Sequence, residues 1–541
     1  MSAVEISARY RIWLLARAPA IALASLVFGW LLWVNHSGQI FEFDPDEGNN
    51  VIKALLVREG YVYGSEIWSD QPPLFSYLLL PAFSLFGLSM DVARAVVSAC
   101  SAWLIFGLYE ALRRSVGHLG SLSAVVILLA SALYVPLSVS AMIGLPCVAC
   151  LTLSALLALE AGALGGRGRR VAVTATFSGI LAGAAVGIKL FSIPVVPVLG
   201  LTAMLARGER SKQPLLDAGV RGAFFSAGFG LTVLLALGPL ALAGTLSGLV
   251  ETHQVAREQA AGSSDGLNAL LRFVREDQAL FALASVGTAL ALARRSLSAL
   301  PWLGWLLIAA AVLRDHSPVW PHHRLLLTVP AAALAGHAFA LELPERTPRA
   351  LRLSFRFVLP VLAAVTLALT LRQEGRLETM VRPEPWTDSE TDWQVFREFA
   401  PYAEKSTLVA TARPTFAFRA GRPVPPNLAV TSWKRFRVGL LESKRVALDI
   451  AASSPQTILF SSRWPGSVRA AVEKKIRKTH KRVKRWRYQS TDLWVSRELL
   501  ASLGQDPLGP GAITQDPLGS VTPGRRRAAE AASRRTDGNA P

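Results

Sequence analysis

Residues 18–47 read APAIALASLVFGWLLWVNHSGQIFEFDPDE, an uncharged apolar run from 18 to 34 that is followed by a group of acidic residues. A helix that crosses a bilayer needs about 20 mainly apolar residues, so the run predicts a first membrane span. Asp44, Asp46 and Glu47 stand just beyond its end. A carboxylate at a low-dielectric membrane edge has a raised pKa unless it is paired, and it is by default a functional candidate.

The apolar character continues along the chain. Of the 541 residues, 51% are hydrophobic, and the mean hydropathy of +0.36 is rarely reached by soluble proteins. The run 74–86 is too short for a span and suits an interfacial or re-entrant helix. About eleven transmembrane helices are predicted, at 18–34, 91–112, 119–140, 142–164, 171–188, 191–206, 222–247, 279–293, 297–313, 325–343 and 357–371. The weakest of these predictions is the span at 279–293.

The placement of Lys and Arg predicts the orientation. With the N-terminus inside, the cytoplasmic segments carry most of these residues, at 9–17, 113–114, 167–170, 207–221, 294–295 and 346–356. Eleven spans then place the stretch 43–87 and the C-terminal part outside a bacterial-type cytoplasmic membrane. The net charge of +19 is therefore a topological signal, and nucleic acid is excluded as a partner.

The composition changes after residue 372. Residues 1–372 are predicted to form the transmembrane domain, with the site in the outer loop 35–90. Residues 373–500 are predicted to form a small extracytoplasmic α/β domain, and the tail 501–541 is rich in Gly, Pro, Ala and Arg and is predicted to be disordered. The predicted elements of the α/β domain are strands at 406–411, 456–462 and 491–496 and a helical run at 467–486. The basic part of that run, from Lys474 to Arg487, is either a solvated helix face or a contact for anionic headgroups of the outer leaflet.

The acidic residues begin a short amphipathic helix in the loop 35–90. Asp44 or Asp46 is suited to cap its N-terminus, where acid also complements the helix dipole. A cap explains one acid and leaves the others, so a general base acting on a hydroxyl is the competing interpretation. Further along, Gln71 precedes two prolines that hold the chain extended, and this is expected to turn Asp70 and Gln71 toward the site.

Several short motifs occur in an order that resembles a known superfamily. They include Asp46-Glu47, the Pro-Pro-Leu at 72–74, Gly187-Ile188-Lys189, His323-Arg324 before the run 325–330, and FAFRAGRPVPP at 416–426. Together they resemble the GT-C glycosyltransferases, in particular the protein O-mannosyltransferases and the lipid A aminoarabinose transferases, over nearly all of 10–500. The fold predicted from this resemblance is an all-α polytopic GT-C-like domain with a small C-terminal α/β domain.

The resemblance implies transfer of a sugar from a polyprenyl-phosphate donor to a hydroxyl of a lipid, glycan or protein acceptor outside the membrane. It implies inversion at the anomeric carbon, with Asp46 as the base and Glu47 beside it. Residues predicted to bind the donor phosphate or the substrate are Lys189, Arg324, His323, Asp70, Gln71, His253 and Arg257. Two positions depart from the family pattern, since Gln71 stands where many relatives have Lys and Gly144 where many have Asp.

No metal site is predicted from ligand spacing, although a divalent metal stays open as a cofactor. The five outer histidines, at 36, 253, 316, 322 and 323, come from separate loops without ligand spacing, and Cys147 and Cys150 fit buried packing thiols inside a span. Two other classes of function stay open. A transporter of polar lipids would need charges deep within spans or an internal repeat. An inactive relative would bind the lipid-linked sugar or act as a scaffold, as the loss of Asp at 144 would allow.

Overall fold

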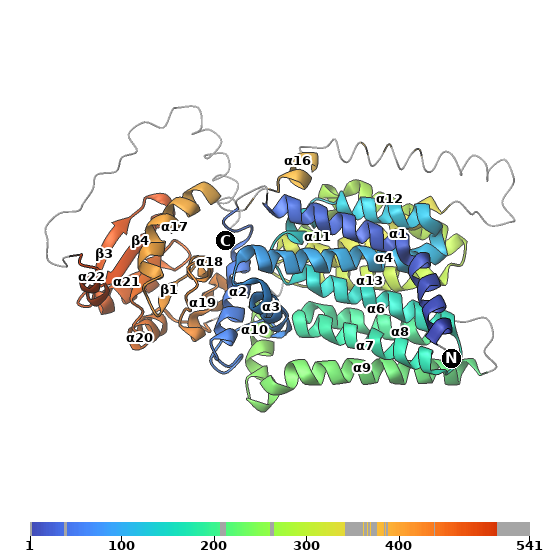
Figure 1. The fold of residues 1–541 in the computed structure, drawn as a ribbon, viewed down its shortest axis with the longest axis horizontal. Coiled ribbons are helices and arrows are strands. Elements are labelled where there is room, and N and C mark those ends of the chain that lie inside the picture. Colours follow the sequence, from blue (N-terminus) through green and yellow to red (C-terminus); the bar gives the residue numbers. More distant parts are fainter. Residues whose placement is uncertain are drawn as a thin grey trace.

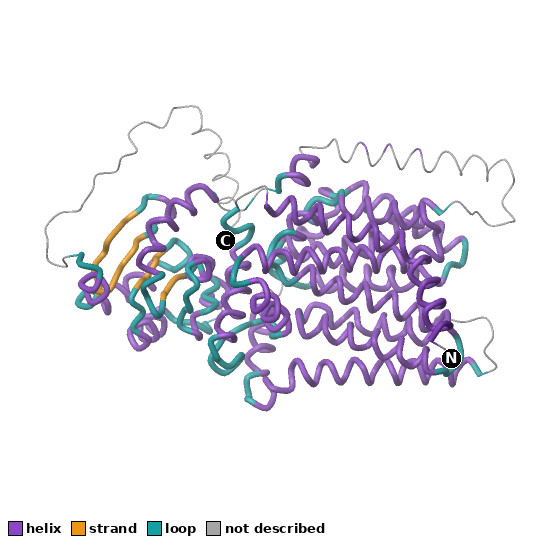
Figure 2. The backbone as a smooth tube through the Cα atoms, in the orientation of Figure 1, coloured by secondary structure: helices purple, strands orange, loops and turns teal. Residues whose placement is uncertain are grey.

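A computed structural model describes residues 3–36, 40–205, 213–259, 265–340 and 376–505 apart from 384, 386, 387 and 438, with three single positions between 361 and 368. A bundle of long helices makes up one part of the molecule, and a domain with a small sheet packs against one end of it (Figure 1). The strands all belong to this second part (Figure 2). The predicted combination of an all-α domain with a small C-terminal α/β domain is confirmed.

The bundle is built by apolar helices that pack side by side. Helix α4 contacts α1, α6 and α14, and α7 lies between α6 and α9. The helices of the bundle are α1 Ala3–His36, α4 Met90–Leu129, α6 Gly144–Leu164, α7 Arg169–Ile188, α8 Val196–Leu205, α9 Pro214–Leu242, α12 Gln278–Ala293, α13 Leu300–Arg314 and α14 Leu325–Gly336. Among the described residues, six helices are long and apolar enough to cross a membrane, and three further apolar helices are shorter. The count of eleven stays a prediction, and the run 357–371 lies almost wholly outside the described residues.

The helix predicted at 119–140 follows a break in α4, but it ends earlier than predicted, and whether it forms a separate span stays a prediction. Helix α4 ends at Leu129, and after a turn the chain forms only the short helix α5 Tyr134–Ser138. The break expected after 112 falls at Gly117, whose φ of 71° is open to glycine and interrupts the helical geometry. Sequence hydropathy did not show the end at Leu129, because the turn that follows is itself apolar and contains several buried residues.

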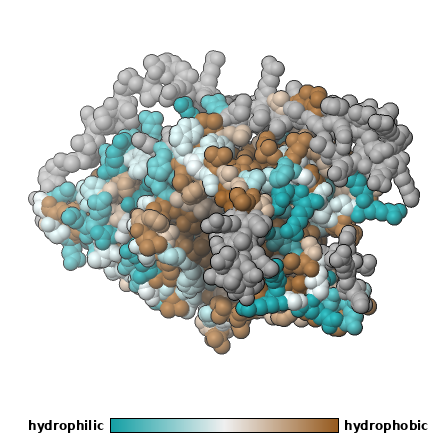
Figure 3. Space-filling model, turned by 45° about the vertical axis from the view of Figure 1, so that its right-hand side comes forward, coloured by the Kyte–Doolittle hydropathy of each residue, from teal (hydrophilic) through white to brown (hydrophobic). Residues whose placement is uncertain are grey.

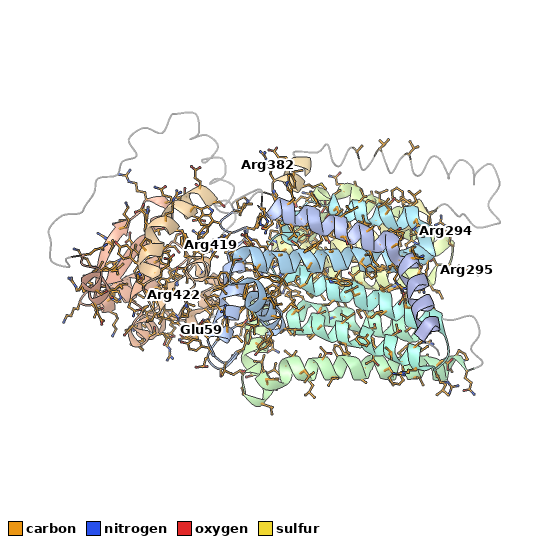
Figure 4. All side chains as sticks on the ribbon, viewed as in Figure 1. Glu59, Arg294, Arg295, Arg382, Arg419 and Arg422 are labelled. Atoms are coloured by element: carbon orange, nitrogen blue, oxygen red, sulfur yellow. The ribbon has the colours of Figure 1, made fainter. Side chains whose placement is uncertain are left out.

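The two ends of the bundle are polar, and its middle is apolar. In the face drawn in Figure 3, brown residues gather over the bundle and teal residues toward its ends and the sheet domain. Arg294 and Arg295 lie at the end of the bundle away from the sheet domain, whereas Glu59 and Arg419 lie near that domain (Figure 4). A belt of apolar surface between polar ends is what a membrane domain presents to lipid.

The sheet domain has four strands in the order β1-β2-β4-β3. Strand β1 is parallel to β2, and β4 is antiparallel to both of its neighbours. The elements are α17 Ser389–Ala403, β1 Val409–Thr411, α18 Pro414–Arg419, α19 Trp433–Arg437, α20 Ser443–Ser453, β2 Thr457–Phe460, α21 Gly466–Ile476, β3 His480–Arg485, β4 Asp492–Ser496 and α22 Arg497–Ser502, and the short α16 Arg376–Val381 precedes them. Most of the predicted tail, 506–541, lies outside the described residues.

The predicted helical run 467–486 is only half helical. Helix α21 ends at Ile476, and residues 480–485 form the edge strand β3. Its basic side chains gather around the buried Asp492, which lies 3.8 Å from Arg482 and 3.6 Å from Arg485. Lys and Arg on an edge strand also discourage pairing with another chain. Strand β3 lies at the end of its domain far from the bundle (Figure 1), which favours the solvated interpretation over contact with lipid headgroups.

Candidate active site

The acidic residues begin helix α2 (Pro45–Arg58) as the sequence predicts. Asp44 has extended backbone geometry, and its carboxylate accepts a hydrogen bond of 2.8 Å from the N–H of Asp46, so Asp44 is the helix cap. Asp46 lies in the first turn and does not serve as the cap. Its carboxylate accepts one hydrogen bond of 3.0 Å from the side chain of Asn49. The capping interpretation therefore accounts for Asp44 and leaves Asp46 available for chemistry.

Glu47 is fully buried and holds the turn to the bundle. Its two oxygens accept hydrogen bonds of 2.9 and 2.8 Å from Arg94 of α4. They also accept the N–H groups of Phe43 and Ala141, each at 2.6 Å. A carboxylate with four donors has its proton-accepting capacity filled. These contacts do not fit the predicted catalytic role of Glu47 and make it a positioning residue for the turn.

The C-terminal domain grips the same turn from its other side through Glu42, which is fully buried. The Glu42 carboxylate accepts hydrogen bonds from Arg413 at 2.5 and 3.1 Å, from Arg463 at 3.0 Å and from Thr415 at 2.6 Å. Burial alone would raise the pKa of Glu42, but the two arginines outweigh it, and the pKa lies below its usual value. We call this cluster, together with Asp392 on the far side of Arg413, the Glu42 clamp.

Backbone contacts complete the attachment. Arg419 of α18 donates a 2.6 Å hydrogen bond to the carbonyl of Phe41. Helix α2 also approaches α18 so closely that a Cβ at Gly48 would lie 2.3 Å from Thr415 Oγ1. Figure 4 shows Arg419 between the sheet domain and the nearer end of the bundle. The acidic turn is therefore held between the two parts of the protein.

Asp46 faces a second carboxylate and two lysines. Burial raises its pKa most, the negative charge of Asp70 raises it further, and Lys53 and Lys189 lower it only in part. Lys53 lies on the same face of α2 two turns after Asp46, and its ammonium is 3.2 Å from Ser69 Oγ. Lys189 follows the end of α7 and is almost fully buried. The predicted residues Asp46, Asp70 and Lys189 therefore lie within each other's electrostatic influence.

The loop before helix α3 (Leu74–Phe86) presents Asp70 and Gln71. Ser69 organises this loop, because its hydroxyl accepts from Tyr63 at 2.9 Å and from the Gln71 N–H at 3.1 Å. The hydroxyl of Tyr63 also lies 3.0 Å from the carbonyl of Gln71. Helix α3 has the bounds predicted from the sequence. Its short length and apolar composition agree with a helix at the membrane surface.

The other predicted cations are placed differently. Arg324 is buried, forms ion pairs with Glu276 and with Asp277, the latter at 3.7 Å, and lies 4.7 Å above the ring of Phe273. These partners offset its charge, while its Nε and one terminal nitrogen are buried without a hydrogen-bond acceptor among the described residues, and its predicted role on a phosphate stays a prediction. His323 stacks on Phe191, with ring centroids 4.8 Å apart.

The remaining predicted site residues are His253 and Arg257, which belong to helix α10 Leu246–Gln259. Their side chains lie outside the part of the chain that the structure describes. Gly144 begins α6, and a Cβ there would make ordinary contacts of 3.6 Å with Leu325 and 3.7 Å with the carbonyl of His322. The described residues contain no group of three or more His, Cys, Asp or Glu side chains placed to hold a metal ion.

The sequence argument missed Lys53, Glu42 and two arginines of the C-terminal domain, Arg435 and Arg463. Lys53 had a usable signal, because it follows Asp46 at a spacing that places both on one face of a helix. The charge of Arg463 acts on Asp46 and Asp44, and that of Arg435 acts on Asp70. Nothing in the local sequence around these arginines indicates that tertiary packing brings them to the outer loop.

The fold and the acidic site define a class of protein, the membrane proteins with a GT-C fold. Residues 70–227 match the family described as dolichyl-phosphate-mannose-protein mannosyltransferase. The structure is similar to that of ArnT from Cupriavidus metallidurans bound to undecaprenyl phosphate, with a TM-score of 0.57 and 14% identity over 89% of this chain and 98% of that one. The predicted resemblance to the GT-C superfamily is confirmed.

A second similar structure is the archaeal oligosaccharyltransferase AglB from Archaeoglobus fulgidus, in complex with an inhibitory peptide and a dolichol-phosphate. It has a TM-score of 0.51 and 12% identity over 83% of this chain and 70% of that one. Both structural similarities establish the fold, since the sequence identities are low. No functionally curated protein sequence matches the chain.

Proposed function

We propose that the protein is an integral membrane glycosyltransferase. It transfers a sugar from a polyprenyl-phosphate donor to an acceptor hydroxyl on the outer face of the cytoplasmic membrane. The family match, the GT-C fold and the lipid phosphates bound to both similar structures support this class of reaction. The observation that carries it is Asp46, a half-buried carboxylate that does not cap its helix and has two lysines within its electrostatic range.

In the proposed reaction Asp46 takes the proton of the acceptor hydroxyl. The acceptor oxygen then bonds to the anomeric carbon from the face opposite the phosphate, and the bond from that carbon to the phosphate oxygen breaks. Polyprenyl phosphate leaves with the electron pair, and the anomeric configuration inverts. Lys189 and Lys53 stabilise the charge that develops on the leaving phosphate. Glu47 and Glu42 hold the turn so that Asp46 keeps its position.

Burial supports the choice of Asp46 as the base. A general base is most effective when its pKa lies near the working pH, and an ordinary aspartate is too acidic for this. Burial and Asp70 both raise the pKa of Asp46. The lysines keep the ionised form accessible, since they oppose this shift. The same residues would therefore tune the base and receive the donor phosphate.

The experiment uses the full chain in nanodiscs with radiolabelled synthetic polyprenyl phosphates that carry different single sugars, and an envelope extract as the acceptor source. Transfer of label to the extract, lost in Asp46→Asn, is the expected result. Consumption of none of the donors would refute the proposed activity. Binding of a donor without turnover would identify an inactive relative, and movement of intact donor between leaflets of a vesicle would identify a transporter.

The proposed orientation has a separate test. The reaction needs the outer loop 35–90 and the C-terminal domain on the outer side, and residues 167–170 on the inner side. An engineered cysteine replacing Glu390 should react with an impermeant thiol reagent in whole cells, and one replacing Gly168 should react only after lysis. The opposite labelling pattern would overturn the orientation and the location of the site.

A further inference from the structure

Arg435 of α19 is a cation that the C-terminal domain places against the outer loop before α3. Its side chain is only 6% exposed, and its guanidinium carbon lies 4.0 Å from the centroid of the Trp68 ring. One nitrogen donates to the carbonyls of Asn427 at 2.8 Å and Val430 at 3.1 Å, which fixes the guanidinium in place. Helix α19 lies on the side of its domain that faces α2 (Figure 1).

The charge of Arg435 has no close counterpart. Among the residues that the structure describes, no carboxylate oxygen lies within 4 Å of it, and Asp449 and Asp70 act on it only from further away. Its Nε is buried without a hydrogen-bond acceptor. A buried guanidinium without a carboxylate to neutralise it is costly, and such a charge is a candidate for binding a ligand.

A complementary group lies in the loop that Arg435 covers. The side-chain oxygen of Gln71 is buried and has no hydrogen-bond donor within the described part of the chain. The loop itself is fixed, because the Gln71 backbone is bonded to Ser69 and Tyr63. The loop and α19 therefore contribute one donor without an acceptor and one acceptor without a donor, beside an aromatic ring and the carboxylate of Asp70.

This set of groups fits a neutral hydroxylated ring. A sugar ring carries several hydroxyls that both donate and accept, so it offers an acceptor to Arg435 and a donor to Gln71. A phosphate only accepts, so it would leave the Gln71 oxygen unpaired and would be repelled by Asp70. Because Asp70 also acts on Asp46, the set lies within electrostatic range of the proposed base. Unpaired buried polar groups also discriminate strongly against a ligand that cannot pair them.

We infer that Trp68, Asp70, Gln71 and Arg435 form a subsite for the sugar ring of the donor, so that the C-terminal domain takes part in sugar selection. This inference rests on the proposed function. The donor is the expected source of the ring, because the loop leads directly into α3, the predicted membrane-surface helix where the lipid chain would lie. An acceptor sugar has the same chemistry and is separated from it by the experiment.

The test compares two kinds of probe on the full chain in nanodiscs without acceptor. One is polyprenyl phosphate alone, and the other is the same lipid carrying mannose, glucose, galactose, N-acetylglucosamine or aminoarabinose. Arg435→Met should weaken the binding of the preferred sugar-bearing probe by roughly ten- to a hundredfold, the value of a hydrogen bond to a charged group. Its affinity for polyprenyl phosphate should stay within about twofold. Arg437→Met, on the exposed side of the same helix, is the matched control and should change neither.

Three outcomes would overturn this inference and leave the proposed function standing. These are an equal loss of affinity for both probes, which would place Arg435 on the phosphate; no loss of affinity for either probe; and, in the separate transfer assay with acceptor present, a change confined to the KM for the acceptor. If Arg435→Met does not fold, Gln71→Leu carries the test, because it removes the unpaired oxygen at similar volume and should weaken only the sugar-bearing probe. A wild-type chain that neither binds nor consumes any sugar-bearing probe would instead refute the proposed function, and the inference with it.

Discussion

Replacing Arg413 by methionine should loosen the C-terminal domain from the acidic turn. Arg413 donates to Glu42 at 2.5 and 3.1 Å and to both oxygens of Asp392 at 2.5 Å, and all three side chains are buried. Its removal leaves two buried carboxylates, and Glu42 alone retains other donors. Breaking a buried ion pair from one side costs about 3–5 kcal/mol. We expect Arg413→Met to lose a free energy of this order from the docking of the domain.

Hydrogen exchange of the amides at 40–48 measures this docking in the folded protein. A loss of 3 kcal/mol or more lowers the protection of these amides roughly a hundredfold when they exchange through opening of the Glu42 clamp. The matched control is Arg445→Met on α20. Arg445 is 69% exposed and pairs with Asp449 at 3.0 Å, so its removal should cost only about 0.2–1 kcal/mol.

Exchange at 40–48 within about threefold of wild type in Arg413→Met would refute the reasoning, since it would mean that the turn does not need the arginine. The Glu42 clamp also predicts a pH dependence. The folded-state pKa of Glu42 is lowered, so its contribution to stability is complete above its unfolded pKa and is lost as the pH falls. Protection at 40–48 should therefore decline in acid before the bundle unfolds.

Three further changes test the site. Asp46→Asn should lower the rate of sugar transfer about 10²–10⁴-fold with folding intact, and retention of more than about a tenth of the activity would reject Asp46 as the base. Asp44→Asn is the control and should change the rate little, because Asn also caps helices. Asp70→Asn should lower the pKa of Asp46 and move the acid limb of the pH–rate profile to lower pH. An unchanged limb would mean that the charge of Asp70 does not act on Asp46. Gly48→Ala should cost about 1–3 kcal/mol, because the new methyl would lie 2.3 Å from Thr415 Oγ1, whereas Gly29→Ala meets nothing within 4 Å and is the control in thermal unfolding.

The local features of the outer loop were predictable because they depend on residues close in sequence. Asp44 and Pro45 specify where α2 begins, and the apolar run 74–86 gives the bounds of α3. The change in composition after 372 likewise indicates the small sheet domain. These signals act within a few residues of one another, so tertiary packing does not need to be known.

The partners of the site were not predictable because they are far apart in the chain. Glu47 looks like a catalytic acid in the sequence, and only its pairing with Arg94 shows that it anchors the turn. Arg324 looks like a free cation at a helix end, and only α11 Asp265–Glu276 and the residue after it supply its counter-charges. Strand β3 exists because β4 follows to pair with it, although its own residues also fit a basic helix.

The charges around Asp46 also predict an order of events. The negative charges of Asp44, Asp46 and Asp70 are opposed by Lys53 and Lys189 and, from the C-terminal domain, by Arg463 and Arg435. A donor phosphate brings a further negative charge to these lysines, and a negative charge nearby raises the pKa of a carboxylate. Donor binding should therefore make Asp46 a stronger base before the acceptor hydroxyl loses its proton. Because kcat reports the complex and kcat/KM the free enzyme, the acid limb of kcat should lie at higher pH than that of kcat/KM for the donor. Coincident limbs would mean that the phosphate does not bind near Asp46.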